Sequence, residues 1–317
     1  MSNILFIGLP YHGYINALTD EMKAQGHTVT FYPVELRRTR DKILHTLSHL
    51  AYRMMLDKFH RRLIRSERES KFDYIIFLQV HTFSMINFIR LKESHPESKY
   101  ILYTWDARSR KIDYVPYIPF FDKACTFDPA DAKTYCMDYL PLFCMRDFQN
   151  PPLVKPDIDV YMVGNLVNPE RYKAVLAFEK YCLTHQISFR KYLKCTPVVL
   201  LQLLINGIIP RGLKLRSLSR SEFMNLFQRS ACTFDFSNHK QSGYTMRLVE
   251  NMCSGKKIIT NNKRILREPF YSPDRFFVFD GFYFKGVGTF IQQPIEEETI
   301  RLDDFYIQSF VKNLLTV

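Results

Sequence analysis

Residues 233–262 read TFDFSNHKQSGYTMRLVENMCSGKKIITNN and combine the hydrophobic patterns of strands and of a helix. A β-rich run at residues 231–236 leads through a polar turn into apolar residues at helical spacing, namely Met246, Val249, Met252 and Cys253. A second short strand is expected at residues 257–260. The order strand, loop, helix, strand is typical of α/β proteins with parallel sheets.

Two glycines bound the expected helix, Gly243 where it begins and Gly255 where it ends. The free N–H groups of a helix N-terminus, beside a polar loop, suit a phosphate group. Lys240 and Arg247 add positive charge there, and Glu250 can accept hydrogen bonds from sugar hydroxyls. The alternative is an ordinary α/β unit in which Glu250 is a solvated helix residue.

Residues 243–260, GYTMRLVENMCSGKKIIT, resemble the nucleotide-sugar motif in the C-terminal domain of GT-B glycosyltransferases. In many of these enzymes a loop glycine, a helix with a glutamate, a small-residue turn and a new strand follow in this order. The resemblance implies that Glu250 binds the ribose of the donor nucleotide. The chain is also similar to bacterial polysaccharide and lipopolysaccharide glycosyltransferases whose loop reads Gly-x-Thr-Met-Arg.

The same resemblance implies contacts to the donor phosphates. They come from the loop and helix start together with Arg247, and the loop residues are Ser242, Gly243, Tyr244 and Thr245. Ser242 is a departure, because the large retaining GT-B group has a glutamate eight positions before the second one. Serine supplies no carboxylate, so that group's contacts and its retention of configuration are not carried over, and inversion is favoured.

Composition and charge narrow the choice of partners. The chain has 317 residues, enough for two domains, and 46% of them are apolar. The net charge is +12, and residues 37–69 contain ten Lys or Arg against four Asp or Glu. Such a surface suits sugar-nucleotide phosphates, an anionic membrane or nucleic acid. The sequence contains no recognisable nucleic-acid module, which favours the membrane surface over nucleic acid.

Cysteine usage and the N-terminus predict a cytoplasmic protein. The seven cysteines include no C-x-x-C pair, which argues for reduced thiols and against a disulfide framework or a zinc site. The first apolar run ends at Pro10 and is expected to be a strand rather than a signal peptide. No stretch reaches the roughly 18 consecutive apolar residues of a spanning helix. Peripheral contact with the inner face of the membrane stays open.

The N-terminal half predicts a doubly wound domain. A strand at residues 4–8, a helix at residues 14–25 and a strand at residues 28–32 are the usual opening of such a domain. The connecting loop has only Gly8 and Gly13 rather than G-x-G-x-x-G, which counts against a nicotinamide-dependent enzyme.

Two side chains beyond predicted strand ends are candidates for a general base. His12 follows the first strand, on the loop that lies at the acceptor side in GT-B enzymes, and imidazole can take a proton near neutral pH. Asp106 follows the strand at residues 99–105, where α/β sheets place ligands. The alternatives are a packing histidine and, for Asp106, a helix cap or an ion pair with Arg108 or Arg110.

Two apolar or basic segments have more than one interpretation. Residues 36–68 predict one long helix or two, with the apolar residues Ile43, Leu47, Leu50, Met54 and Met55 packed on the core and the basic side in solvent. Contact of that basic side with anionic lipid stays open. Residues 198–210, VVLLQLLINGIIP, are too short to span a bilayer and predict a buried helix, with an interfacial helix as the alternative.

A proline-rich stretch at residues 147–159 predicts an interdomain linker. After it, a strand at residues 160–163 leads to Asn165 and to a helix whose first turn contains Arg171. In GT-B enzymes the matching loop faces the donor diphosphate, so Asn165 and Arg171 are expected to flank the phosphates; the alternative for Arg171 is a surface residue. A final helix at residues 303–315 is expected, and it can return to the first domain.

The sequence therefore predicts two Rossmann-like domains facing each other across a cleft, residues 1–150 on the acceptor side and 151–317 for the nucleotide sugar. The expected reaction transfers a sugar from a nucleotide-sugar donor to a hydroxyl of a bacterial surface glycan, which can be lipid-linked. No cofactor is expected, and no metal, since the acidic run at residues 296–298 is interpreted as a solvated helix start. A membrane-surface scaffold or a nicotinamide-dependent enzyme are the alternatives.

Overall fold

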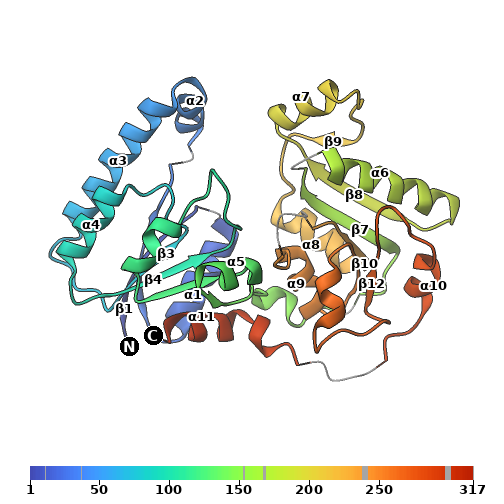
Figure 1. Ribbon diagram of the computed structural model, residues 1–317. Coiled ribbons are helices and arrows are strands. Elements are labelled where there is room, and N and C mark those ends of the chain that lie inside the picture. Colours follow the sequence, from blue (N-terminus) through green and yellow to red (C-terminus); the bar gives the residue numbers. More distant parts are fainter. Residues whose placement is uncertain are drawn as a thin grey trace. The chain divides into compact units, whose positions relative to one another are not determined.

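The computed structural model describes residues 1–10, 12–36, 38–152, 154–166, 169–237, 242–296 and 301–316, without the side chains of His12, Thr39, Lys42 and Val198. The chain forms two compact units. Unit 1 consists of Met1–Met145 and Asp304–Val317, and unit 2 of Arg146–Asp303. Each unit is a parallel sheet with helices on both faces (Figure 1).

Unit 1 contains a six-stranded sheet in the order β2-β1-β3-β4-β5-β6. All its pairings are parallel, with Ile4 of β1 opposite Val29 of β2 and Tyr74 of β3. The strands are β1 Asn3–Gly8, β2 Thr28–Pro33, β3 Tyr74–Leu78, β4 Lys99–Thr104, β5 Lys123–Thr126 and β6 Asp138–Tyr139. The central strands are apolar on both faces because helices cover both sides of the sheet.

Unit 1 contains helices from both ends of the sequence. They are α1 His12–Ala24, α2 Thr39–Leu47, α3 His49–Ser66, α4 Met85–Ser94, α5 Pro129–Tyr135 and α11 Ile307–Leu315. Leu63 of α3 and Phe88 of α4 pack with alternate strand residues such as Phe77 on one face. On the other face, α11 contacts α1 and β4, and the ring of Phe310 lies 4.9 Å from that of Tyr103.

The structure corrects the face on which the segment at residues 36–68 was expected to pack. Ile43, Leu47, Leu50 and Met54 are exposed, whereas the buried residues of α3 are Tyr52, Leu56, His60, Leu63 and Ile64. The chain breaks at Ser48, which ends α2 and accepts the Ala51 N–H as the N-cap of α3. Because the break shifts the helical phase, a pattern drawn through both helices selects the wrong face.

Unit 2 repeats the architecture with the strand order β12-β11-β10-β7-β8-β9, again all parallel. The strands are β7 Ile158–Asn165, β8 Phe189–Lys194, β9 Leu213–Lys214, β10 Ser230–Asp235, β11 Lys257–Thr260 and β12 Phe276–Val278. The helices are α6 Pro169–Thr184, α7 Pro197–Ile205, α8 Arg220–Arg229, α9 Met246–Cys253 and α10 Val287–Gln292.

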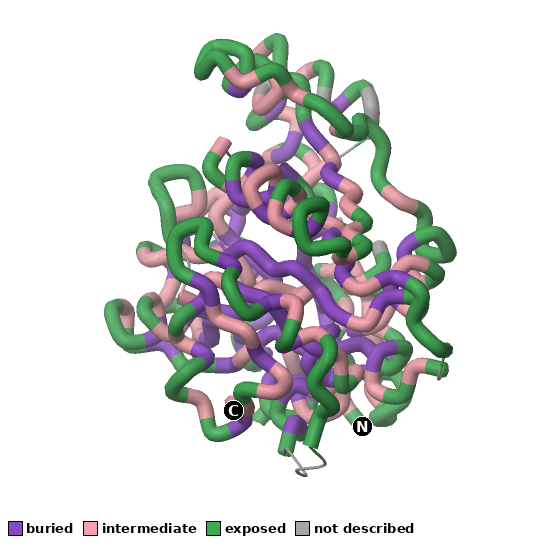
Figure 2. The backbone as a smooth tube through the Cα atoms, turned by 90° about the vertical axis from the view of Figure 1, so that its right-hand side faces the viewer, coloured by how far each residue is buried: buried purple, intermediate pink, exposed green. Residues whose placement is uncertain are grey.

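Each face of the second sheet has an aromatic core. On one side, Phe178 of α6 stacks on Phe234 of β10, with ring centroids 4.2 Å apart. On the other side, Phe223 and Phe227 of α8 contact the ring of Tyr161. In Figure 2 the buried residues follow the strands, and the exposed residues lie on helices and loops. The parallel sheets and the helix order agree with the α/β class predicted from the sequence.

Local signals in the sequence fix several helix ends. Ser219 and Glu222 form the predicted capping box of α8, and Asp128 caps α5 by accepting two backbone N–H groups. Helix α9 ends at Cys253, and Gly255 follows the end as expected, with a φ of +73° that is readily adopted only by glycine. It begins later than Gly243, because Thr245 is its N-cap.

The structure also corrects the expectation that residues 198–210 are buried. Helix α7 packs through Leu203 on unit 2, but Leu201, Leu204, Ile205 and Ile209 are exposed. In Figure 1, α7 lies beside β9, at the edge of the sheet of unit 2. A helix at the edge of the sheet has neighbours on one side only, which its composition does not reveal. Within the described ranges, no helix is long and apolar enough to cross a membrane.

Candidate functional site

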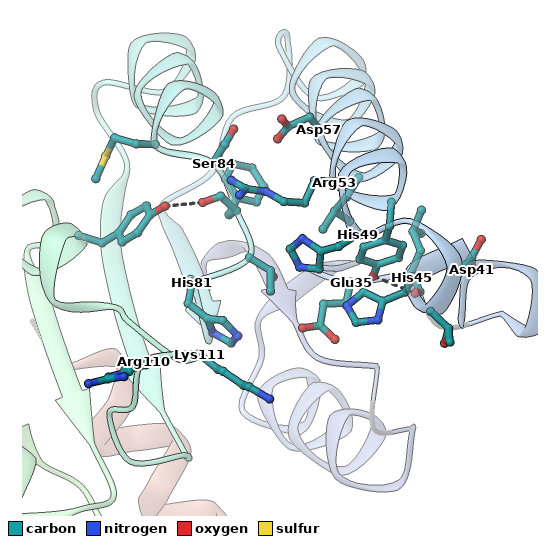
Figure 3. A pocket seen from close by; sticks show the side chains of 18 residues that line it. Glu35, Asp41, His45, His49, Arg53, Asp57, His81, Ser84, Arg110 and Lys111 are labelled. Atoms are coloured by element: carbon teal, nitrogen blue, oxygen red, sulfur yellow. Dashed lines mark hydrogen bonds between the residues drawn. The ribbon is translucent and has the colours of Figure 1, made fainter. Parts of the chain in front are cut away.

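A pocket of about 970 Å³ opens at the carboxyl edge of the sheet of unit 1. Residues that follow β2, β3 and β4 line it together with residues of α2 and α3 (Figure 3). Its titratable lining residues are Glu35, Asp41, His45, His49, Tyr52, Arg53, Asp57, His81, Arg110, Lys111 and Tyr117. The carboxyl edge is where parallel α/β sheets bind ligands.

His81 is a partly buried histidine in the lining of this pocket. Burial lowers the pKa of the His81 imidazole, and the charge of Glu35 partly opposes this effect by raising it. The ring nitrogen Nδ1 is buried and has no hydrogen-bond partner among the described residues. In Figure 3, His81, His49 and Glu35 project into the same space. A neutral imidazole in this position can accept a proton from a ligand hydroxyl.

Positive charge in the pocket comes from residues that have no ionic partner of their own. The side chains of Arg53, Arg110 and Lys111 form no hydrogen bond or ion pair within the part of the chain that the structure describes. Across the described residues, no group of three or more His, Cys, Asp or Glu side chains is arranged to hold a metal ion. The pocket thus has the mixed polar character of a site for a hydroxyl-rich ligand.

Asp106, one of the predicted bases, lies beyond β4 and accepts a hydrogen bond of 3.0 Å from the Gln79 side-chain amide. Gln79 directly follows β3, is fully buried and has a φ of +70°. A non-glycine residue with positive φ is strained, and such strain often occurs at functional sites. Gln79 therefore fixes the orientation of the Asp106 carboxylate. The other predicted base, His12, begins α1, but its side chain lies outside the described part.

In unit 2, the start of α9 is built around the buried carboxylate of Asp235. Thr245 accepts the Leu248 N–H as N-cap and donates to Asp235 Oδ1 at 2.7 Å. Asp235 Oδ2 accepts from the hydroxyls of Ser237 and Thr260. Three hydroxyl donors therefore satisfy a carboxylate that is buried at the carboxyl edge of the sheet.

Arg171 and Asn165 lie together, joined by a bond from the Arg171 side chain to the Asn165 backbone, and their predicted role beside the donor phosphates stays a prediction. The Arg171 guanidinium donates to the carbonyl oxygens of Asn165 at 2.7 Å and of Phe236 at 2.6 Å. It thereby joins the loops that follow β7 and β10. Burial lowers the pKa of Arg171, and the charge of Asp235 acts in the opposite direction. Arg171 remains a cation beneath the loop, since arginine side chains stay protonated in proteins.

Glu250 and Arg247 form an ion pair on α9. Glu250 is fully buried, whereas the side chain of Arg247 is 30% exposed and stacks on Phe223, with its guanidinium carbon 3.9 Å from the ring centroid. Arg247 therefore lies between Glu250 and the surface. The predicted role of Glu250 in binding ribose stays a prediction, and it requires the Arg247 side chain to move.

The predicted loop residues have different environments. Ser242 is partly exposed, while Gly243 and Tyr244 are buried, and the Tyr244 hydroxyl donates to Glu268 at 2.6 Å. Tyr244 thus supports the loop from below rather than presenting its hydroxyl to a ligand. Lys240 lies outside the described residues, as do the glutamates at 297 and 298.

Comparison with solved structures identifies the fold. The catalytic domain of starch synthase IV from Arabidopsis thaliana, bound to ADP and acarbose, superposes with a TM-score of 0.62 at 9% identity, covering 100% of this chain and 95% of that one. AviGT4, a glycosyltransferase involved in avilamycin A biosynthesis, gives 0.60 at 11% identity over 99% and 96%. The chain has the GT-B fold.

A third GT-B structure, an α-glucosyltransferase in complex with UDP and a 13-mer DNA, superposes with a TM-score of 0.59 at 12% identity, covering 87% of this chain and 81% of that one. No protein-family model and no curated protein matches the sequence. The likeness is therefore one of fold over nearly the whole chain. Two Rossmann-like units, as predicted from the sequence, are confirmed.

Three residues that line the pocket of unit 1 were not predicted from the sequence. His81 lies three residues beyond β3, and Glu35 lies two residues beyond β2. The rule that selected His12 and Asp106, a polar residue just past the carboxyl end of a strand, applies to both. Arg53 lies on α3 and has no such signal, because its approach to the pocket depends on the break at Ser48.

Proposed function

We propose that this protein is a glycosyltransferase that moves a sugar from a nucleotide-sugar donor to an acceptor hydroxyl. In this proposal unit 2 binds the donor and unit 1 binds the acceptor. The observation that supports it most is the GT-B fold over 99–100% of the chain, shared with a starch synthase bound to ADP and with AviGT4. Polar residues at the carboxyl edge of each sheet add to it.

The donor phosphates are proposed to lie at the start of α9. The loop from Ser242 to Thr245 and the first turn of α9 offer backbone N–H groups to anionic oxygens. Arg247 supplies charge, and its movement towards the phosphates would open Glu250 to the ribose. Asn165 and the partly buried Arg171 flank the same edge, and Lys240 belongs to the loop sequence. Cationic side chains and helix N–H groups would stabilise the leaving diphosphate without a metal ion.

The acceptor is proposed to occupy the pocket that His81, Glu35 and Arg53 line. Its attacking hydroxyl must lose a proton as the new glycosidic bond forms, and three side chains are candidates for the base: Asp106, His12 and His81. Gln79 acts as a positioning residue for Asp106. We favour inversion at the anomeric carbon because Ser242 replaces the glutamate of the retaining group. A bacterial surface glycan, such as lipopolysaccharide or capsule, is the proposed acceptor class.

A binding screen tests the donor half of the proposal. The purified protein is heated with UDP, GDP, ADP, CMP, TDP or NAD, each at several concentrations. A nucleotide at ten times its dissociation constant stabilises the folded state by about 1.4 kcal/mol, which raises the melting temperature by a few degrees. One nucleoside diphosphate is expected to give this shift. No shift with any nucleotide would refute the proposal.

A variant pair makes the screen specific. Glu250→Gln keeps the size of the side chain and is expected to lower nucleotide affinity at least ten-fold. Glu222→Gln, on the exposed capping box of α8, is the matched control and is expected to leave affinity unchanged. Equal affinities of the Glu250→Gln variant and the unmodified protein would remove Glu250 from the donor site.

A further inference from the structure

Helix α7 is apolar on two opposite faces, and only one of them is covered. Leu203 is buried against unit 2, with Val199 and Leu200 partly buried beside it. Leu201, Leu204 and Ile205 follow at the spacing i, i+3, i+4, which places them on a common face, and they are 57%, 52% and 75% exposed. A helix that is apolar all round normally has neighbours all round.

Two further exposed apolar residues follow α7 in the sequence. Ile209 is 74% exposed and Leu215, just after β9, is 71% exposed. We call these five residues, Leu201, Leu204, Ile205, Ile209 and Leu215, the α7 patch. Single exposed leucines are ordinary on protein surfaces, but several within one short segment of 15 residues mark a binding surface.

The charge around the α7 patch has one sign. Between Glu179 and Glu222 the sequence contains eight Lys or Arg and no Asp or Glu. Lys191 and Arg216 pair with those two flanking glutamates. The side chains of Arg211 and Lys214, which stand within the patch sequence, are exposed and form no ion pair in the described part of the chain. Two cations without an ionic partner therefore lie in the same segment as the exposed aliphatic side chains.

We infer that the α7 patch docks unit 2 onto an anionic lipid bilayer. The leucine and isoleucine side chains enter the boundary between headgroups and acyl chains, and Arg211 and Lys214 bind the lipid phosphates. A helix of nine residues, roughly 14 Å long, lies in this boundary and does not cross the bilayer. An anionic membrane surface is complementary in charge to residues 180–221, a segment of 42 residues without an acidic side chain.

This inference is independent of the proposed glycosyl transfer. It concerns only unit 2 and requires neither a nucleotide nor an acceptor. Loss of vesicle binding would leave the nucleotide screen unaffected, and failure of that screen would leave vesicle binding unaffected. Where both hold, the acceptor would be a glycan on a lipid at the same membrane.

Sedimentation with vesicles tests the inference directly. The full chain is mixed with vesicles of phosphatidylcholine alone or of phosphatidylcholine and phosphatidylglycerol at three to one. We expect binding to the anionic vesicles that is at least ten-fold tighter than to the neutral ones. Binding is also expected to weaken steeply as salt is raised from roughly 0.1 M to 0.5 M, because salt screens the phosphates. Absence of binding to the anionic vesicles would overturn the inference.

Substitution of exposed side chains separates the patch from the rest of the surface. The double variant Leu204→Asn/Ile205→Asn is expected to bind anionic vesicles at least ten-fold more weakly, with an unchanged melting temperature because both residues are exposed. Leu183→Asn is the matched control, because Leu183 is a leucine on another helix of unit 2, α6, and is 77% exposed. It lies eleven residues beyond Tyr172, whose hydroxyl donates to the Arg211 carbonyl. An equal loss in the control would refute a specific docking surface.

The cations are tested in the same way. Arg211→Gln/Lys214→Gln is expected to weaken binding roughly 30-fold, since each basic residue near an anionic surface contributes about a factor of five. Lys285→Gln removes an exposed, unpaired lysine elsewhere in unit 2 and is the control. If the protein instead forms dimers that Leu204→Asn/Ile205→Asn dissociates, and vesicles do not bind, the patch is a contact between copies and the inference is wrong.

Discussion

His60 is a single buried side chain that can determine how the stability of unit 1 falls at acidic pH. It lies on α3 with no exposed surface, and its Nε2 is 3.0 Å from the carbonyl oxygen of Val34. Its ring stacks on Phe83 with centroids 4.1 Å apart, and Nδ1 has no partner among the described residues. A proton on Nδ1 would place a charge in this apolar site, and burial accordingly lowers the pKa of His60 to about 4.

The lowered pKa predicts a loss of stability in acid. Between the ordinary value of 6.5 and about 4 the unfolded chain binds the proton and the folded chain does not. Stability is therefore full above pH 6.5 and falls as the pH drops towards 4, by about 2 kcal/mol at pH 5. His60→Gln stays neutral and is expected to remove this part of the pH dependence.

Trp105 provides the measurement, because it is the only tryptophan and lies in unit 1. Urea unfolding followed by its fluorescence at pH 8 and pH 5 gives the free energy of unfolding of that unit. His185→Gln, at an exposed histidine after α6, should leave the pH dependence unchanged. An equal loss at pH 5 in the His60→Gln variant would contradict the assignment.

At the residue scale the sequence reveals types and spacing but not proximity. Asp106 was predicted because it follows an apolar strand, and the same reasoning reaches His81. Nothing in the sequence indicates that Gln79 adopts a positive φ, because glutamine has no preference for that conformation. For Glu250, the motif shows its position on a helix, but its burial beneath Arg247 depends on Phe223, which comes from another helix.

At the scale of elements, α9 depends on a cap that does two things. Thr245 accepts the Leu248 N–H and also donates to the buried Asp235 carboxylate. Thr245→Val keeps the shape but removes both bonds. A lost N-cap costs about 1 kcal/mol, and an unsatisfied buried acceptor costs roughly 1–3 kcal/mol more. We expect a destabilisation of unit 2 by about 2–4 kcal/mol.

Ser219→Ala on α8 is the matched control for this cap. Ser219 also accepts a backbone N–H, from Glu222, but it is exposed and bonds no buried carboxylate. Ser219→Ala should lower the free energy of unfolding of unit 2 by about 1 kcal/mol. Circular dichroism follows both units, and the Trp105 transition should stay in place for both variants. Equal losses for the two variants would show that Asp235 does not depend on Thr245.

Elements that are buried on two faces were predicted better than elements at an edge. The apolar runs of β1, β3 and β4 admit only one placement, in the middle of a parallel sheet. The start of helix α8 was predicted from its capping box. The errors fall at α2, α3 and α7, where apolar residues outnumber the positions that the neighbouring elements can cover. Composition alone does not tell which of two apolar faces is covered.

At the scale of the whole molecule, unit 1 is built from both ends of the sequence. Helix α11 packs on β4 and α1, and the Lys123 side chain donates to the Asn313 carbonyl at 2.7 Å. Folding of unit 1 therefore requires a helix that is synthesised after all of unit 2. The two units have separate cores, so a defect in α11 should affect one unfolding transition and not the other.

Phe310 tests this division. Its ring is fully buried in unit 1, 4.9 Å from the Tyr103 ring and 4.7 Å from the Phe143 ring. Phe310→Ala leaves a cavity there, and such substitutions cost about 3–5 kcal/mol. The free energy of unfolding from the Trp105 transition should fall by that amount, so its midpoint moves to a lower urea concentration. The part of the circular dichroism change that belongs to unit 2 should not move.

Lys312→Ala, on the exposed side of α11, is the control and should shift neither transition. A parallel shift of both transitions in Phe310→Ala would show that the units unfold as one, because only coupling between them can carry a cavity in one core into the stability of the other.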